Sequence, residues 1–151
     1  MPPSTHHDSL TGLPNRRLFD DRLRQALYLA ERRDGAVAVM LLGLALAGPH
    51  DERLVELSAR LGSCVRRADT LARYGAAELA FVLNDVAGED DCRLVAAHLL
   101  EAVAAMAADL APAIGIALHS RGPVDAEALL RNADAALDRA RHGREPVCLC
   151  R

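Results

Sequence analysis

Apolar and polar residues follow two different periods along this chain, and together the two periods predict nine secondary-structure elements. Apolar residues recur every three or four positions, as is typical of amphipathic helices, over residues 16–32, 51–65, 89–109 and 125–142. Short, mainly apolar runs predict strands at residues 36–46, 70–74, 78–83, 113–118 and 146–150. Asn15 is a good N-cap for the first helix, and Asp34-Gly35 is a suitable end for it.

The order of these elements predicts the fold class. It reads α, then β-α-β-β-α-β, then α-β. The inner six elements have the split βαβ pattern of ferredoxin-like folds. We therefore expect an α/β (α+β) domain with a mixed, mainly antiparallel sheet, an extra N-terminal helix and a C-terminal αβ unit. Residues 8–151 are assigned to this domain, and residues 1–7 are expected to form a flexible N-terminus.

Composition narrows the class of protein. A chain of 151 residues with 51% hydrophobic and 26% charged residues is typical of one globular domain, and with 3% aromatics its core must consist mainly of Leu, Ala and Val. The net charge of −3 argues against a nucleic-acid binder or a protein attracted to anionic membranes. The longest apolar run, 36–48, is too short for a membrane span, and the N-terminus has no signal-peptide pattern. We therefore expect a cytoplasmic location.

The four cysteines do not predict a metal site. Cys64 and Cys92 lie at apolar helix positions and are expected to be small buried residues. Cys148 and Cys150 would point to the same face of a strand, but zinc sites need a Cys-x-x-Cys spacing and a second pair of ligands. No cofactor is expected.

The stretch 66–83 predicts a β-hairpin with the turn Gly75-Ala76-Ala77, and Gly75 is the natural residue for a positive φ angle. The tip of this hairpin carries one carboxylate, that of Glu78. An enzyme that handles phosphates through Mg²⁺ needs more than one acidic ligand.

Three segments, in order, resemble the GGDEF domain of the diguanylate cyclase family. They are Asp8-Ser-Leu-Thr-Gly-Leu-Pro-Asn-Arg-Arg-Leu-Phe19, the hairpin with Gly75-Ala-Ala-Glu-Leu79 at the place of the signature, and Ile114-Gly-Ile-Ala117 followed by the helix from Asp125. The resemblance covers nearly the whole chain from Asp8. It implies the fold predicted above and a family reaction in which two facing domains join two GTP molecules into cyclic di-GMP. Carboxylates of the family hold Mg²⁺ on the phosphates.

The chain departs from the family pattern at the residues that carry this chemistry. Gly43 and Ala45 stand at the two Asp positions that end the first strand, and the segment after Ala45 is several residues shorter. Ala77 replaces the metal-binding acid of the signature, so only Gly75 and Glu78 remain. Arg141 and Arg144 keep the basic character of a phosphate-contacting segment that is one residue short. The resemblance therefore implies lost cyclase activity, no bound metal and no GTP binding, with Mg²⁺ needed only if some activity remains.

A second family site is retained. Arg66-Arg-Ala-Asp69 matches the Arg-x-x-Asp that binds cyclic di-GMP as an inhibitor in relatives, and Arg93 stands where relatives supply a second arginine. The guanidinium fork suits phosphates and guanine edges, and a carboxylate accepts from guanine N–H groups. The alternative is a charged helix end, at which Arg66 and Arg67 complement the helix dipole and Asp69 pairs with either of them.

Three functional hypotheses remain open. The domain binds cyclic di-GMP through Arg66, Asp69 and Arg93; or it is an interaction module, as a homodimer or with a partner signalling domain, that needs no nucleotide; or it retains weak cyclase activity. Family members usually carry a sensor or receiver domain upstream, and none is visible in this sequence.

Overall fold

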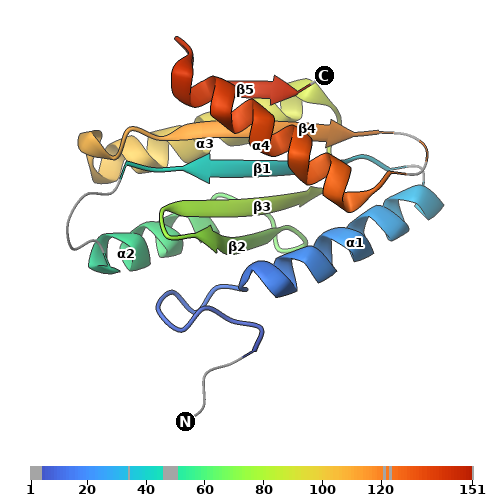
Figure 1. Ribbon diagram of the computed structural model, residues 1–151, viewed down its shortest axis with the longest axis horizontal. Helices are drawn as coiled ribbons and strands as arrows, with labels where there is room; N and C mark the ends of the chain where they lie inside the picture. The colour runs from blue at the N-terminus through green and yellow to red at the C-terminus, as the bar shows by residue number, and fades with distance from the viewer. Residues whose placement is uncertain (1–4, 34, 46–50, 121, 123, 151) are drawn as a thin grey trace.

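The nine elements that the hydrophobic pattern predicts all form, in the predicted order (Figure 1). The computed structural model describes residues 5–33, 35–45, 51–120, 122 and 124–150. Its elements are α1 (Arg16–Arg33), β1 (Val37–Gly43), α2 (Asp51–Gly62), β2 (Thr70–Gly75), β3 (Glu78–Asn84), α3 (Glu89–Met106), a short 3-10 helix η1 (Ala108–Leu110), β4 (Ala113–His119), α4 (Ala126–His142) and β5 (Val147–Cys150).

The strands form one five-stranded sheet in the order β2-β3-β1-β4-β5. The central strand β1 is antiparallel to both β3 and β4, β2 is antiparallel to β3, and β5 is parallel to β4. Every residue of β1 is buried, which explains its continuous apolar sequence. The predicted mixed, mainly antiparallel sheet is confirmed.

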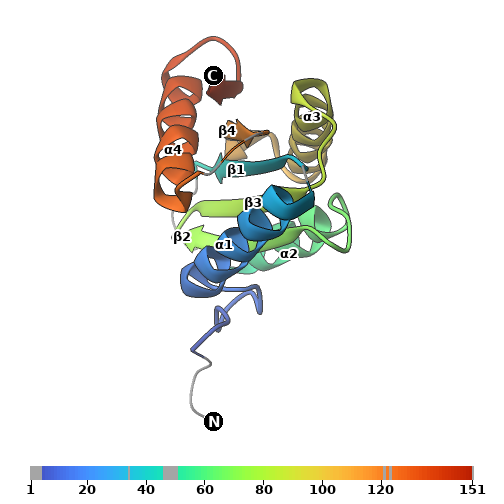
Figure 2. The same ribbon diagram turned by 90° about the vertical axis from the view of Figure 1, so that its right-hand side faces the viewer.

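Helices cover both faces of this sheet. Because successive side chains of a strand point to opposite faces, β1 contributes to two cores. Val37, Val39 and Leu41 lie in the core that contains residues of α1 and α4, whereas Ala38, Met40 and Leu42 lie in the core that contains residues of α2 and α3. Figure 2 shows α4 and α3 on opposite sides of the sheet. The alternation assigns Gly43 to the face that α1 and α4 cover.

Several elements end earlier than the sequence predicts. β1 ends at Gly43 rather than at position 46, because the next two backbone N–H groups leave the ladder: that of Leu44 donates to Ala77 O (3.0 Å) and that of Ala45 to Leu110 O (2.7 Å). α2 ends at Gly62 instead of position 65. The helix predicted for 89–109 ends at Met106, beyond which an extended residue leads into η1.

The prediction of a positive φ angle at Gly75 is wrong. The described glycines with positive φ are Gly12, Gly88 and Gly122. Gly75 still belongs to β2, where it pairs with Glu78, and the ladder shifts register between Arg73 and Gly75. The turn follows this irregularity of the ladder and is made without a left-handed glycine.

The described part of the predicted flexible N-terminus is held to the domain. Thr5 O accepts a hydrogen bond from Asn15 Nδ2 (2.9 Å), His6 O accepts one from the Asn15 backbone N–H (2.8 Å), and His7 forms a β-bridge with Pro14. Residues 5–7 thus contact the turn that leads into α1. Residues 1–4 lie outside the described part.

The predicted N-cap and one of the two predicted buried cysteines are confirmed. Asn15 Oδ1 accepts from the backbone N–H of Leu18 at 3.0 Å. Cys92 is fully buried, and burial, with the charges of Asp91 and Glu89, raises the pKa of its thiol to about 11. Cys64 is only half-buried, because it lies beyond the end of α2. Among the described helices, none has an apolar stretch long enough to cross a membrane.

Candidate functional site

The end of β1 and the hairpin tip meet at one end of the sheet (Figure 1). Gly43 is the cross-strand partner of Glu78 in β3, and Glu78 is also the partner of Gly75 in β2. Side-chain alternation places Glu78 on the same face as Gly43, because Ala80 and Val82 of β3 lie in the core beneath α1 and α4. The sequence-predicted remnants Gly75 and Glu78 are thus adjacent to the position where the family places its first acidic ligand.

A guanidinium group lies over Gly43. A Cβ atom at position 43 would lie 2.9 Å from both Cζ and Nε of Arg141 and closer still to its Nη2. Real Cβ atoms do not approach other atoms this closely, so the guanidinium takes the space that any side chain at position 43 would need. Arg141 Nη2 donates a hydrogen bond to Glu78 Oε1 at 3.2 Å, and the two side chains form an ion pair.

The close packing of α4 brings this arginine into place. A Cβ atom on Gly115, in the middle of β4, would lie 2.6 Å from the backbone Cα of Leu137 in α4. The absent side chain therefore lets the helix approach the strand directly. Gly115 pairs with Leu41 and Ala113 with Gly43, so the last turn of α4 extends over the end of β1.

This arrangement does not fit a divalent metal ion. Mg²⁺ requires oxygen ligands, commonly one or two carboxylates in addition to phosphate oxygens and water. Here a guanidinium already pairs with the Glu78 carboxylate, and Gly43 supplies no ligand. Within the described ranges, no three His, Cys, Asp or Glu side chains come together in a way that could hold a metal ion.

Arg144 lies just beyond α4. It lines a shallow cavity of about 250 Å³ together with Arg141, Pro112 and Pro146. The structure thus brings the two predicted phosphate-contacting arginines to one surface. The shortened segment after Ala45 covers positions 46–50, which lie outside the described residues.

The Arg66–Asp69 loop lies at the opposite end of the sheet, where β2 begins and β3 ends (Figure 1). Asp69 organises this loop. Its Oδ1 accepts the backbone N–H of Asn84 (2.9 Å), and its Oδ2 accepts the backbone N–H of Arg66 (3.1 Å) and Arg66 Nε (3.4 Å). Only 3% of the Asp69 side chain is exposed, against 59% of the Arg66 side chain. The carboxylate is therefore buried in the loop, while the arginine faces solvent.

The helix-end interpretation of this loop is only partly supported. α2 ends at Gly62, four residues before Arg66, and Arg66 Nη2 donates to the carbonyl oxygen of Asn84 in β3 instead of to a carbonyl of α2. The predicted pairing of Asp69 with Arg66 is confirmed. The arginine thus links the loop to the neighbouring strand end, and a helix-dipole role does not explain its position.

Arg93 lies in the second turn of α3, which begins five residues after Asn84. It pairs with Glu89 one turn earlier (3.2 Å) and leaves 42% of its side chain exposed. The structure places Arg66 and Arg93 at the same end of the sheet, and no direct contact between them occurs.

A cavity beside this loop is lined by three arginines, of which the sequence pattern indicated only Arg67. It has a volume of about 470 Å³ and lies between α1 and the ends of β2 and β3. Arg22 and Arg33 of α1 and Arg67 of the loop line it. Within the described part of the chain, none of these three arginines forms an ion pair, and Asp85 is the acidic residue on the same wall besides the buried Asp69. Helical spacing would have shown Arg22 and Arg33 on one side of α1, but only the tertiary fold brings Arg67 to them.

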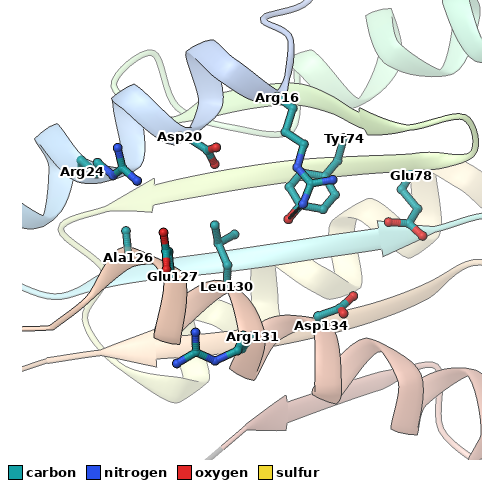
Figure 3. Close-up of a pocket in the computed structure, with 10 residues that line it drawn as sticks. All are labelled: Arg16, Asp20, Arg24, Tyr74, Glu78, Ala126, Glu127, Leu130, Arg131 and Asp134. Atoms are coloured by element: carbon teal, nitrogen blue, oxygen red, sulfur yellow. Dashed lines mark hydrogen bonds between the residues drawn. The ribbon is translucent and has the colours of Figure 1, made fainter.

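A second cavity, of about 490 Å³, lies between α1 and α4 (Figure 3). The Arg16 guanidinium lies 4.1 Å from the centre of the Tyr74 ring and donates to the Tyr74 hydroxyl at 3.0 Å. Burial raises the pKa of this hydroxyl, the charge of Arg16 lowers it, and Asp20, Asp134 and Glu78 raise it further. Mixed charges therefore line the cavity, and no single ligand class is favoured.

The Asp8–Pro14 turn is attached to the hairpin. Asp8 Oδ2 accepts from both the backbone N–H and the hydroxyl of Thr11 (2.9 and 2.8 Å), and Asp8 forms an ion pair with Arg73 at 3.1 Å. Arg73 also donates to the carbonyl oxygens of Gly75 (3.3 Å) and Ala76 (3.4 Å). The opening motif is thus structural: it connects the entry of the domain to the hairpin tip.

Comparison with known families identifies the family of this chain. Residues 5–45 and 48–145 match the family described as "Diguanylate cyclase, GGDEF domain". The chain therefore belongs to the GGDEF domain family, as its motifs predict.

Two relatives from Pseudomonas aeruginosa are named for cyclic di-GMP turnover. The chain is 36% identical over 159 residues to "Bifunctional diguanylate cyclase/cyclic di-GMP phosphodiesterase MucR", an alignment that includes 94% of this chain and 23% of MucR. It is 30% identical over 148 residues to "Diguanylate cyclase TpbB", which includes 87% of this chain and 34% of TpbB. The chain thus spans about a quarter to a third of the length of these relatives.

Solved structures share the fold. The GGDEF domain of PA1120 (TpbB or YfiN) from Pseudomonas aeruginosa superposes with a TM-score of 0.86 at 29% identity, covering 97% of this chain and 95% of that domain. The GGDEF domain of DgcB from Caulobacter crescentus, solved in complex with c-di-GMP, has a TM-score of 0.83 at 21% identity and covers 99% of this chain and 98% of that one. At that identity the second likeness concerns the fold alone.

Proposed function

We propose that this GGDEF domain has lost cyclase activity and acts in cyclic di-GMP signalling by binding cyclic di-GMP at the Arg66–Asp69 loop. Its relatives MucR and TpbB are named for cyclic di-GMP enzymes, which supports the signalling context. The four free cysteines fit the reducing cytoplasm, where we expect the protein to act.

The loss of activity is inferred from the hairpin end. Phosphoryl transfer depends on positioning and on metal-assisted charge stabilisation. Gly43 and Ala77 supply no carboxylate, and Glu78 pairs with Arg141. A purified domain is therefore expected to produce no cyclic di-GMP from GTP with Mg²⁺ or Mn²⁺, and measurable turnover would overturn this part of the proposal.

The observation that carries the binding proposal is the ordered arginine-rich loop at the other end. Arg66 is exposed but anchored through Asp69, so little conformational entropy is lost when it meets a ligand. Arg67, with Arg22 and Arg33, adds positive charge within a cavity beside the same loop, and none of the three pairs with an acidic side chain of the described residues. Guanidinium groups bind phosphates through two parallel hydrogen bonds, and cyclic di-GMP offers two phosphates.

In this proposal the residues of the motif have different roles. Arg66 and Arg93 contact the ligand, since both side chains are substantially exposed. Asp69 was expected to accept from guanine, but its two oxygens already accept three N–H groups of the protein. Its role is therefore to hold Arg66 and the loop in place.

Calorimetric titration with cyclic di-GMP and GTP side by side tests the proposal. Cyclic di-GMP should bind, GTP should not, and Arg66→Ala should weaken binding about tenfold or more, because a hydrogen bond to a charged group contributes about 1.5–3 kcal/mol. Arg60→Ala is the matched control, since Arg60 is a comparably exposed arginine that pairs with Glu56 on α2. The proposal fails if the unmodified domain does not bind cyclic di-GMP at tens of micromolar, or if both variants bind alike.

A nucleotide-independent interaction module is the second candidate. Large apolar side chains are exposed at Tyr28 and Leu29 on α1 and at Leu94 on α3, and such side chains are common in protein interfaces. A partner, or a homodimer, that is retained by the double variant Arg66→Ala, Glu78→Ala would support this role. Loss of the partner in that variant alone would count against it.

A further inference from the structure

At the hairpin end, Arg141 has contacts with both Gly43 and Glu78 that involve protein atoms alone. The Arg141 guanidinium lies where a side chain at position 43 would extend, and it pairs with the carboxylate of Glu78. Both Gly43 and Glu78 belong to the α1/α4 face of the sheet, and they are direct cross-strand partners. Between the two strand ends and α4, the positive charge of Arg141 thus lies against the negative charge of Glu78.

From this geometry we propose that the Arg141 guanidinium supplies the positive charge at this end of the sheet and takes the place of a divalent metal ion. The guanidinium neutralises Glu78 and fills the space above Gly43. A side chain at position 43 therefore requires the Arg141 guanidinium to move away from Gly43. The site cannot regain a metal by a new carboxylate alone, because the guanidinium must leave as well.

The packing of α4 explains why the arginine remains there. The close contact of Gly115 with the backbone of α4 fixes the helix on β4, so its last turn cannot retreat from the end of β1. Arg141 emerges from that turn, one position before His142 ends the helix. Only the flexible end of its side chain can move, and moving it leaves Glu78 without its partner.

A double-mutant cycle on thermal stability tests the steric part. Replacing a strand glycine by alanine ordinarily stabilises, so in an Arg141→Ala background Gly43→Ala should raise the Tm by about 2 °C. With Arg141 present the same change displaces the guanidinium, and the Tm should stay level or fall. Gly62→Ala is the control, because a Cβ atom there has no neighbour within 4 Å, and it should shift the Tm equally in both backgrounds.

Titration with Mn²⁺ alone, followed by the electron paramagnetic resonance signal of the free ion, tests the charge part. The unmodified domain should bind no Mn²⁺. The variant Gly43→Asp, Arg141→Ala should bind it at least about tenfold more tightly than Gly43→Asp alone, since removal of one nearby positive charge is worth at least that factor near a protein surface.

The proposal is overturned if Gly43→Ala shifts the Tm equally with and without Arg141. It is also overturned if Gly43→Asp binds Mn²⁺ no more weakly than the double variant, or if the unmodified domain binds Mn²⁺. Neither measurement uses cyclic di-GMP. A failure of the proposal about Arg141 can therefore be distinguished from a failure of the cyclic di-GMP binding proposal.

Discussion

Removal of the Asp69 carboxylate should separate its structural role from ligand binding. The backbone N–H groups of Arg66 and Asn84 donate hydrogen bonds to the Asp69 carboxylate, at 3.1 and 2.9 Å. In Asp69→Ala both N–H groups lose this acceptor. The Arg66 side chain loses its anchor as well. The bonds that remain in the loop include those from Arg66 Nη2 to the Asn84 carbonyl, from Asn84 Nδ2 to Ala68 O and from the Asp69 backbone N–H to Arg66 O.

The size of the effect follows from burial. The Asp69 side chain is 3% exposed, so solvent does not readily replace it as an acceptor. A buried donor left without a partner costs about 1–3 kcal/mol. Two backbone donors lose their acceptor, the Asn84 N–H at a part-buried position and the Arg66 N–H at an exposed one, so Asp69→Ala should lower the free energy of unfolding by about 2–3 kcal/mol. For a domain of this size the Tm should fall by about 5–10 °C.

Urea denaturation followed by circular dichroism measures this change. Asp109→Ala is the matched control, because Asp109 forms an ion pair with Arg53 while 72% of its side chain is exposed, and an ion pair in solvent contributes little to stability. If the two variants lost the same stability, the structural role of Asp69 would be refuted. If Asp69→Ala kept its stability yet lost cyclic di-GMP binding, direct contact with the ligand would be the better explanation.

Three further predictions concern packing, pH and thiol reactivity. Gly115→Ala should destabilise the domain by about 1–3 kcal/mol, because the new Cβ atom meets the backbone of α4 rather than a flexible side chain. Gly62→Ala is the control and should not destabilise it, because a Cβ atom there has open space. Thermal unfolding of the two variants compares their stabilities. Burial raises the pKa of Asp8, but hydrogen bonds from Thr11 and the charge of Arg73 outweigh it and lower the pKa overall. The contribution of Asp8 to stability should thus be complete above its unfolded-state pKa and be lost as the pH falls through its lower folded-state pKa. Asp8→Asn should flatten the acid side of the stability profile, and an unchanged profile would contradict the ion pair. Cys92, fully buried with a thiol pKa of about 11, should resist alkylation near neutral pH until the domain unfolds, and rapid labelling of the native domain would disprove its burial.

Much of the fold was predictable because its information is local. Apolar spacing identified the helices and strands, and Asn15 marked the start of α1 through a hydrogen bond within one turn. The ends of elements were less predictable. β1 stops at Gly43 because Leu44 and Ala45 bond to the hairpin and to η1, and these partners lie far away in sequence.

For the candidate sites, the residues were predictable from the sequence but the contacts between them were not. The sequence identified Glu78, Arg141, Arg66 and Asp69 by residue type and motif. It did not predict that Arg141 would meet Glu78, since 62 residues separate them in the chain and the meeting depends on how closely α4 packs on Gly115. The register shift between Arg73 and Gly75 is equally a property of paired strands.

By itself, then, the sequence determined the family, the order of elements and the absence of acidic side chains at Gly43 and Ala77, because residue identity and local periodicity suffice for these. Only the tertiary structure decided what lies in their place. The Arg141 guanidinium occupies the space above Gly43, where a carboxylate is missing. The Asp69 side chain is buried and holds its loop in place. Charges and hydrogen-bond partners depend on distances across the fold, and spacing along the chain does not specify those distances.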